Sequence, residues 1–187
     1  MKAKTFLLSV VLLFVGVSIF AVNNKKKKEV TSSMSLQITS SAFGEGEFIP
    51  LRYTCDGPDV SPPLNWTGTP TGCKSFALIC DDPDAPVGTW VHWVIYNIPP
   101  SSHGLKENVP KEVELKDGTK QGINDFRRIG YGGPCPPHGV PHRYFFKLYA
   151  LSKMLTLPSG ATKDQLLSAM EGSILAKAEL MGRYRRK

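Results

Sequence analysis

Proline and glycine recur so often in this chain that long helices have little room to form. The 187 residues include 15 Pro and 17 Gly, which cluster at 55–72, 81–88 and 130–141. Proline breaks helices, disfavours helix in the residue before it, and shares with glycine a preference for turns. Between the clusters lie short apolar runs, the clearest at 75–80, 91–97 and 143–151. Apolar runs bounded by turn residues are typical of strands, so the pattern predicts a mainly β protein.

The strand over 91–97 alternates in a way that assigns its faces. We expect His92, Val94 and Tyr96 on one face, opposite Trp93 and Ile95. The run over 143–151 should likewise gather its aromatic and apolar side chains on one face, namely His142, Tyr144, Phe146 and Leu148. A short strand is also expected at 64–66, and an edge strand at 48–53, because that segment carries a proline.

The last part of the chain changes to a helical period. Thr162 and Gln165 form a capping-box pattern. The apolar residues that follow recur at helical spacing: Leu166, Leu167, Met170, Ile174, Leu175 and Met181. They predict a C-terminal helix that packs on the sheet.

The N-terminus has the composition of an export signal. Lys2 and Lys4 precede an apolar run over 6–20 that ends at Ala21. We therefore expect a signal peptide over 1–21, a flexible Lys-rich leader over 22–34 and a single domain over 35–187, in a periplasmic or secreted protein. Because Lys25–Lys28 could instead stop translocation, an uncleaved anchor is the alternative. In an oxidising compartment the four cysteines, Cys55, Cys73, Cys80 and Cys135, can form disulfides, with the pairing open.

The formal net charge of +7 lies mostly in the two tails. A nucleic-acid surface needs basic residues along a folded face with aromatic residues between them, and the middle of the chain has no such face. The sequence therefore predicts no nucleic-acid partner. The Lys25–Lys28 run could still make loose contact with an anionic membrane surface.

Unusual residue types gather in three segments, at 81–86, 88–92 and 130–144, and all four histidines lie in or near them. His138 and His142 have the spacing of a helical zinc pair, but the surrounding prolines prevent a helix, so no metal is predicted. The Gly-Gly-Pro-Cys-Pro-Pro run at 132–137 is either a backbone anion nest or simply a rigid turn.

His92 and His142 each begin an expected strand at a loop mouth, with Asp82 available as a carboxylate. They are either structural histidines or parts of a site, and such a trio could support acid–base chemistry. No nucleophile completes a triad, Gly-x-Ser-x-Gly is absent, and no phosphate-loop motif occurs. The residues alone therefore identify no catalytic residue and no cofactor, and they leave a His-based hydrolase as an alternative.

Five motifs occur in an order that resembles the phosphatidylethanolamine-binding protein family, also called the Raf kinase inhibitor protein family, and its bacterial branch. They lie at 53–64, 82–86, 90–93, 132–137 and 142–144, and the similarity continues through 175–180. The resemblance implies an antiparallel Greek-key β-sandwich with few short helices and a small pocket for phosphate, acetate or phosphorylethanolamine-like groups. Carried over by motif, its wall would be Asp82, Trp90, His92, Cys135, Pro136, Pro137, His142 and Tyr144.

The resemblance carries three further expectations. It implies a cis peptide in the loop over 82–86, for which Ala85–Pro86 is the candidate. Cys55 and Cys135 both lie in the matched motifs, so they are expected close together and able to form a disulfide, although Cys73 and Cys80 are equally available. The short segment 87–89 suggests an open pocket rim.

These observations predict an exported protein that binds a phosphorylated head group. Histidines would hold the phosphate, and Asp82 would attract an ammonium or orient a histidine. The alternative is an inhibitor or effector that presents its loops to a protein partner. The sequence does not predict an oligomeric state.

Overall fold

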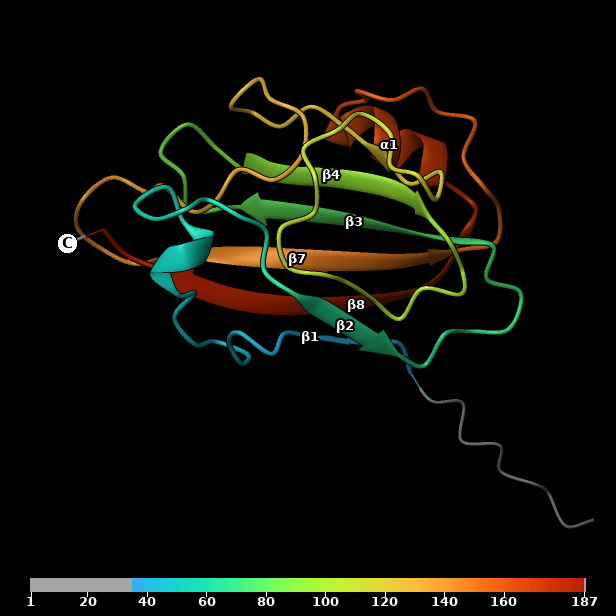
Figure 1. The fold of residues 1–187 in the computed structure, drawn as a ribbon, viewed down its shortest axis with the longest axis horizontal. Coiled ribbons are helices and arrows are strands. Elements are labelled where there is room, and N and C mark those ends of the chain that lie inside the picture. Colours follow the sequence, from blue (N-terminus) through green and yellow to red (C-terminus); the bar gives the residue numbers. More distant parts are fainter. Residues whose placement is uncertain (1–34, 187) are drawn as a thin grey trace, which may run out of the picture. The chain divides into compact units, whose positions relative to one another are not determined.

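Two antiparallel sheets contain most of the regular structure in the computed structural model, which describes residues 35–186 (Figure 1). The signal peptide expected at 1–21 and the leader expected at 22–34 lie outside the described residues. The elements are β1 (Gln37–Thr39), a 3-10 helix (Leu51–Tyr53), β2 (Leu64–Thr67), β3 (Ser75–Asp82), β4 (Trp90–Ile98), β5 (Gly104–Leu105), β6 (Lys120–Gln121), β7 (His142–Leu151), α1 (Lys163–Met170) and β8 (Ile174–Tyr184).

The larger sheet has the strand order β6-β4-β3-β7-β8, and all its neighbours are antiparallel. β7 returns to lie beside β3 after β4 and β6 have been added on the other side, which is the Greek-key arrangement. The smaller sheet has the order β1-β2-β5. The expected antiparallel Greek-key sandwich is thus confirmed.

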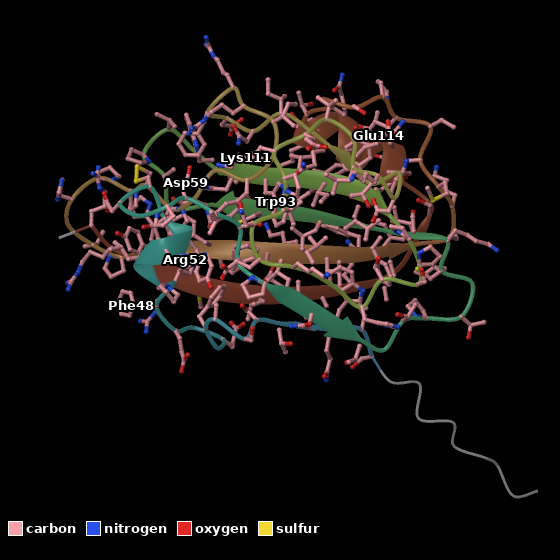
Figure 2. The ribbon with its side chains drawn as sticks, viewed as in Figure 1. Phe48, Arg52, Asp59, Trp93, Lys111 and Glu114 are labelled. Atoms are coloured by element: carbon pink, nitrogen blue, oxygen red, sulfur yellow. A yellow bond between two sulfur atoms is a disulfide. The ribbon has the colours of Figure 1, made fainter. Side chains whose placement is uncertain are left out.

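β3 is the central strand, and all eight of its residues are buried. Phe76 and Leu78 belong to the core shared with Trp66 of the smaller sheet, whereas Ala77 and Ile79 belong to a second core with Leu166 of α1. Because successive side chains of a strand point to opposite faces, β3 builds both cores. In Figure 2, Trp93 of the neighbouring β4 lies among the strands; it is fully buried.

The predicted C-terminal helix forms only in its first part. Its capping box is present: the Thr162 hydroxyl accepts from the Gln165 amide, and the Gln165 side chain accepts from the Thr162 amide. The helix ends at Met170, and Gly172 has φ +68°, a left-handed conformation that favours glycine. The extension of the helix to Met181 was wrong, because those residues pair with β7 along the whole of β8.

The prediction of an edge strand at 48–53 was also wrong. Only Phe48 forms a bridge, to Arg183, and a 3-10 helix follows over Leu51–Tyr53. Pro50 precedes that helix with φ −60°, an angle that the proline ring fixes. Among residues 35–186, no helix is long and apolar enough to cross a membrane.

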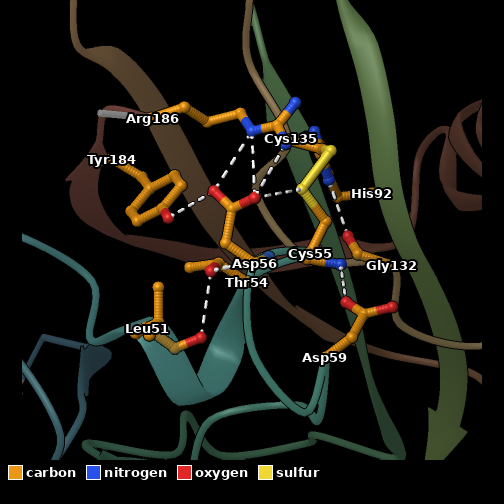
Figure 3. The surroundings of a disulfide bond; sticks show 11 residues. Leu51, Thr54, Cys55, Asp56, Asp59, His92, Gly132, Cys135, Tyr184 and Arg186 are labelled. Atoms are coloured by element: carbon orange, nitrogen blue, oxygen red, sulfur yellow. Dashed lines mark hydrogen bonds and ion pairs between the residues drawn. A yellow bond between two sulfur atoms is a disulfide. The ribbon is translucent and has the colours of Figure 1, made fainter. Parts of the chain in front are cut away.

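A disulfide joins Cys55, after the 3-10 helix, to Cys135, before β7 (Figure 3). The Cα atoms are 5.4 Å apart although the residues are 80 apart in sequence. Cys73 and Cys80 are free thiols, the first half-buried and the second buried. The pairing that the motifs suggested is therefore present.

Removing this disulfide should destabilise the domain strongly. The cross-link restricts the unfolded chain over a long loop, so the Cys55→Ser/Cys135→Ser variant should lose about 4 kcal/mol of unfolding free energy, measured by urea denaturation. Cys73→Ser, which changes a free thiol, should lose much less. Equal losses in the two proteins would contradict a stabilising role for the cross-link.

Candidate ligand-binding site

A pocket of about 200 Å³ lies where β3 ends and where β4 and β7 begin. Its wall contains all of the predicted site residues except Tyr144, and it includes four further residues. The lining residues are Asp82, Ala85, Pro86, Val87, Trp90, His92, Phe126, Cys135, Pro136, Pro137 and His142. Antiparallel pairing explains the convergence, since the end of β3 meets the beginnings of both of its neighbours.

Asp82 and His142 form a buried pair. The Asp82 Oδ2 atom lies 2.8 Å from His142 Nδ1, and the residues are only 3% and 6% exposed. The other carboxylate oxygen, Oδ1, accepts from the Asp84 amide at 2.8 Å. Because an ionised carboxylate only accepts hydrogen bonds, Nδ1 of His142 carries a proton. Nε2 is therefore the ring nitrogen left for a ligand.

A β-bulge places His92 in the site. The register between β3 and β4 shifts between the pairs Cys80↔Trp93 and Asp81↔Val91, so His92 is the extra residue. Its ring packs edge-on against Tyr144, with centroids 5.1 Å apart. The expectation that His92 shares a face with Val94 and Tyr96 was wrong, because the bulge interrupts the alternation.

His92 is held in the same way as His142. Its Nδ1 lies 2.6 Å from the Gly132 carbonyl oxygen, which can only accept, so Nδ1 carries the proton. Burial lowers the pKa of His92, while the Gly132 carbonyl and the Asp82 charge oppose this shift. The ring is therefore neutral at neutral pH. In this form Nε2 accepts a hydrogen bond, and it donates only after a second proton is bound.

The Gly/Pro run at 132–137 is an irregular segment, and it is neither a turn nor an anion nest. The Gly132 amide donates to the His92 carbonyl at 2.9 Å, and the Gly133 amide donates to Asp59 Oδ1 at 2.6 Å. Prolines in the run have no N–H to offer. A Cβ at Gly133 would lie 2.4 Å from the Tyr53 carbonyl oxygen, so glycine permits contact with the protein's own backbone.

An ion pair joins the loop after β3 to the start of β7. Arg143 donates through Nε and Nη2 to the two oxygens of Asp84, at 2.9 and 2.7 Å, and its amide donates to Oδ2. The Arg143 hydrogen bonds lower the pKa of Asp84. The cis peptide expected at Ala85–Pro86 was wrong, since residues 35–186 contain no cis peptide. The trans form is the lower-energy isomer of an X–Pro bond.

Two polar groups near the pocket have no hydrogen-bond partner among the described residues: the Tyr144 hydroxyl and the Trp90 indole N–H. Tyr144 is fully buried, and burial, followed by the Asp82 charge, raises its pKa far above the usual value. It packs against His92 instead of lining the pocket. Trp90 does line the pocket, and its indole can donate at any pH.

Phe126 is a wall residue that sequence reasoning missed. Its ring lies edge-on to Trp90 and His92, with centroids 5.4 and 5.3 Å apart. Asp125 brings it there, because its Oδ2 accepts from the Val91 amide at 2.7 Å. The only signal in the sequence was an aromatic residue within a polar connection.

The described part of the chain contains no group of three His, Cys, Asp or Glu side chains placed to hold a metal ion. His138 lines a different cavity from His142. The pocket wall contains two imidazole rings whose Nδ1 atoms are bonded within the protein, together with the Trp90 ring. Once the imidazoles are protonated, their Nε2 atoms become donors, which suits recognition of an anion.

The depressed pKa of His92 should make stability depend on pH. The unfolded chain binds a proton at His92 near pH ~6.5, whereas the folded chain resists it, so the unfolding free energy should fall as pH drops from 7 to 5. His92→Asn keeps a donor for Gly132 and should reduce this fall, as measured by urea denaturation. His103→Asn, on the surface, should follow the wild type. Parallel pH curves for wild type and His92→Asn would contradict the prediction.

Comparisons with known proteins identify the family. Residues 39–185 match the phosphatidylethanolamine-binding protein family. A UPF0098 protein of Methanothermobacter thermautotrophicus is 58% identical over 151 residues, which cover 81% of this chain and 99% of the relative. One from Aquifex aeolicus is 54% identical over 153 residues, covering 81% and 89%.

Solved structures show the same fold. The chlamydial PEBP homologue CT736 of Chlamydia trachomatis superposes with a TM-score of 0.75 at 43% identity, covering 82% of this chain and 99% of that one. E. coli YbcL, described as a member of the mammalian PEBP family, gives 0.76 at 35% identity, with the same coverage. The chain therefore belongs to the phosphatidylethanolamine-binding protein family.

Proposed function

We propose that this protein binds a small phosphorylated head group, of the phosphorylethanolamine type, in the pocket between Asp82, His92 and His142. The observation that carries the proposal is that both histidines are held through the same ring nitrogen. Each Nδ1 is committed to an acceptor within the protein, so each ring has one nitrogen left to meet a ligand. Two fixed imidazoles in the wall of a pocket of about 200 Å³ suit a group the size of a phosphate.

The hydrogen-bond pattern couples anion binding to proton uptake. Because each neutral ring uses its only N–H within the protein, Nε2 can donate to a phosphate oxygen only in the imidazolium form. A bound anion favours that form and raises the pKa of His92 above its lowered value in the free protein. Affinity for the anion should therefore be high at low pH and fall as pH rises through the pKa of His92 in the complex.

Asp82 gives a reason to prefer a zwitterion to bare phosphate. Its carboxylate is almost fully buried, and both oxygens already accept hydrogen bonds, which supports a role in orienting His142. Its negative charge still lies beside the bound anion. An ammonium on the ligand would offset this repulsion, since unbalanced charge in a buried site is costly.

Calorimetric titration with phosphorylethanolamine at pH 6 and pH 8 tests the proposal. Binding should be tighter at pH 6. His142→Asn keeps a donor for Asp82 but removes Nε2, so it should weaken binding about ten- to a hundredfold, the effect of one lost charge-assisted hydrogen bond. His103→Ala, on the surface away from the pocket, is the control and should bind as the wild type does.

The phosphate of phosphorylethanolamine can itself change protonation between pH 6 and pH 8. O-sulfoethanolamine is a control for this effect, because its sulfate does not titrate in this range. Tighter binding of this ligand at pH 6 would identify the histidines as the groups that take up the proton. Equal affinity for both ligands at the two pH values, or a His103→Ala defect as large as that of His142→Asn, would show that the pocket is misplaced.

Export is the second part of the proposal. The residues expected to form the signal lie outside the described part of the chain, and support comes from the Cys55–Cys135 disulfide, because disulfides persist mainly in oxidising compartments. N-terminal sequencing of protein recovered from the expressing cells should give a mature chain that begins at Val22. A mature chain that begins at Met1 would rule out cleavage.

A further inference from the structure

A second cavity lies on the other side of the disulfide from the pocket. Its volume is about 600 Å³, and it is lined by Phe48, Ile49, Leu51, Asp56, His138, Tyr184, Arg185 and Arg186. Asp56 follows Cys55 in sequence, and His138 lies three residues after Cys135, so the cross-linked loops contribute to its wall (Figure 3). The site is therefore distinct from the pocket that contains His92 and His142.

One part of this cavity is apolar and open to solvent. Phe48 and Leu51 are 51% and 56% exposed, and because both line the same cavity they form one apolar patch. Ile49 is buried between them. Figure 2 shows Phe48 at the edge of the molecule, below the 3-10 helix. Cavities of this volume with mainly apolar walls commonly hold small organic ligands.

The other part is basic. Asp56, the one carboxylate in the wall, is already satisfied: it accepts from the Tyr184 hydroxyl at 2.7 Å and pairs with Arg186 at 2.9 Å. The hydrogen bond from Tyr184 lowers the pKa of Asp56 most, and the hydrogen bond from Arg186 lowers it further. Arg185 is exposed and forms no ion pair with any residue between 35 and 186.

Arg183 adds a further positive charge beside the apolar part. Its guanidinium lies over the Phe48 ring at 4.9 Å, and its Nε donates to the Gly46 carbonyl at 2.6 Å. It too has no ion-pair partner in the described range. A cationic rim beside an apolar wall complements a molecule with one apolar chain and one anionic end.

We propose that this cavity binds a single-chain anionic amphiphile of the long-chain carboxylate class. The chain packs against Phe48, Ile49 and Leu51, and the carboxylate meets Arg185. A free phosphate would leave the apolar wall exposed to water, and an uncharged chain would leave Arg185 without a partner. The site goes beyond the proposed head-group pocket and does not depend on it.

Calorimetric titration with laurate below its micelle concentration tests the proposal on the mature protein. Saturable 1:1 binding is expected. Phe48→Ser and Arg185→Gln should each weaken it about tenfold, the effect of losing one apolar contact surface or one charged contact. The matched controls are Met154→Ser, which changes a side chain as exposed as Phe48, and Lys116→Gln, which removes an exposed cation elsewhere. Both should bind as the wild type does.

Two further titrations test whether the two sites bind their ligands independently. Phe48→Ser and Arg185→Gln should leave phosphorylethanolamine affinity unchanged, and His142→Asn should leave laurate affinity unchanged. The proposal is overturned if laurate shows no saturable binding, or if dodecyltrimethylammonium, with the same chain and a positive head, binds as tightly. It is also overturned if laurate binding is lost in His142→Asn and kept in Arg185→Gln, because laurate would then occupy the other pocket.

Discussion

The end of β3 carries two adjacent aspartates that face opposite sides of the central sheet. Asp81 is fully buried and pairs with Lys147 of β7 and Lys163 of α1, while Asp82 pairs with His142 on the pocket side. A buried carboxylate without a partner costs about 3–5 kcal/mol. If β3 shifted by one residue against its neighbours, each aspartate would move to the opposite face of the sheet and lose its partner. The two ion pairs therefore fix the register of β3, and with it the position of the site.

The sequence predicted the parts of this arrangement that depend on local pattern. The apolar runs that became β3, β4 and β7 were recognised from their length and their flanking turn residues, and the start of α1 was recognised from the capping box at Thr162. The pocket residues came from the order of the family motifs, whose segments follow one another across the ends of three paired strands. Local chemistry and motif order together were enough to assemble most of the wall.

Features that depend on long-range contacts were not predictable in the same way. Residues 174–181 have helical spacing, yet β8 forms because β7 offers a strand edge along its whole length. The bulge at His92 is a property of two strands in register, so the sequence of one strand does not reveal it. The run at 132–137 was recognised as either an anion nest or a turn, but only the fold shows that the Gly132 and Gly133 amides donate to the protein itself.

The disulfide has a mechanical consequence for the domain. The segment between Cys55 and Cys135 contains β2 to β6, that is, strands from both sheets, whereas β1, β7 and β8 lie outside it. Tension applied to the two ends of the chain passes through the sulfur–sulfur bond and bypasses this segment. Stretching can therefore extend only the chain outside the disulfide loop, which includes β1, β7, α1 and β8. Roughly 270 Å of chain, the extended length of 80 residues, cannot be extended until a reductant opens the bond.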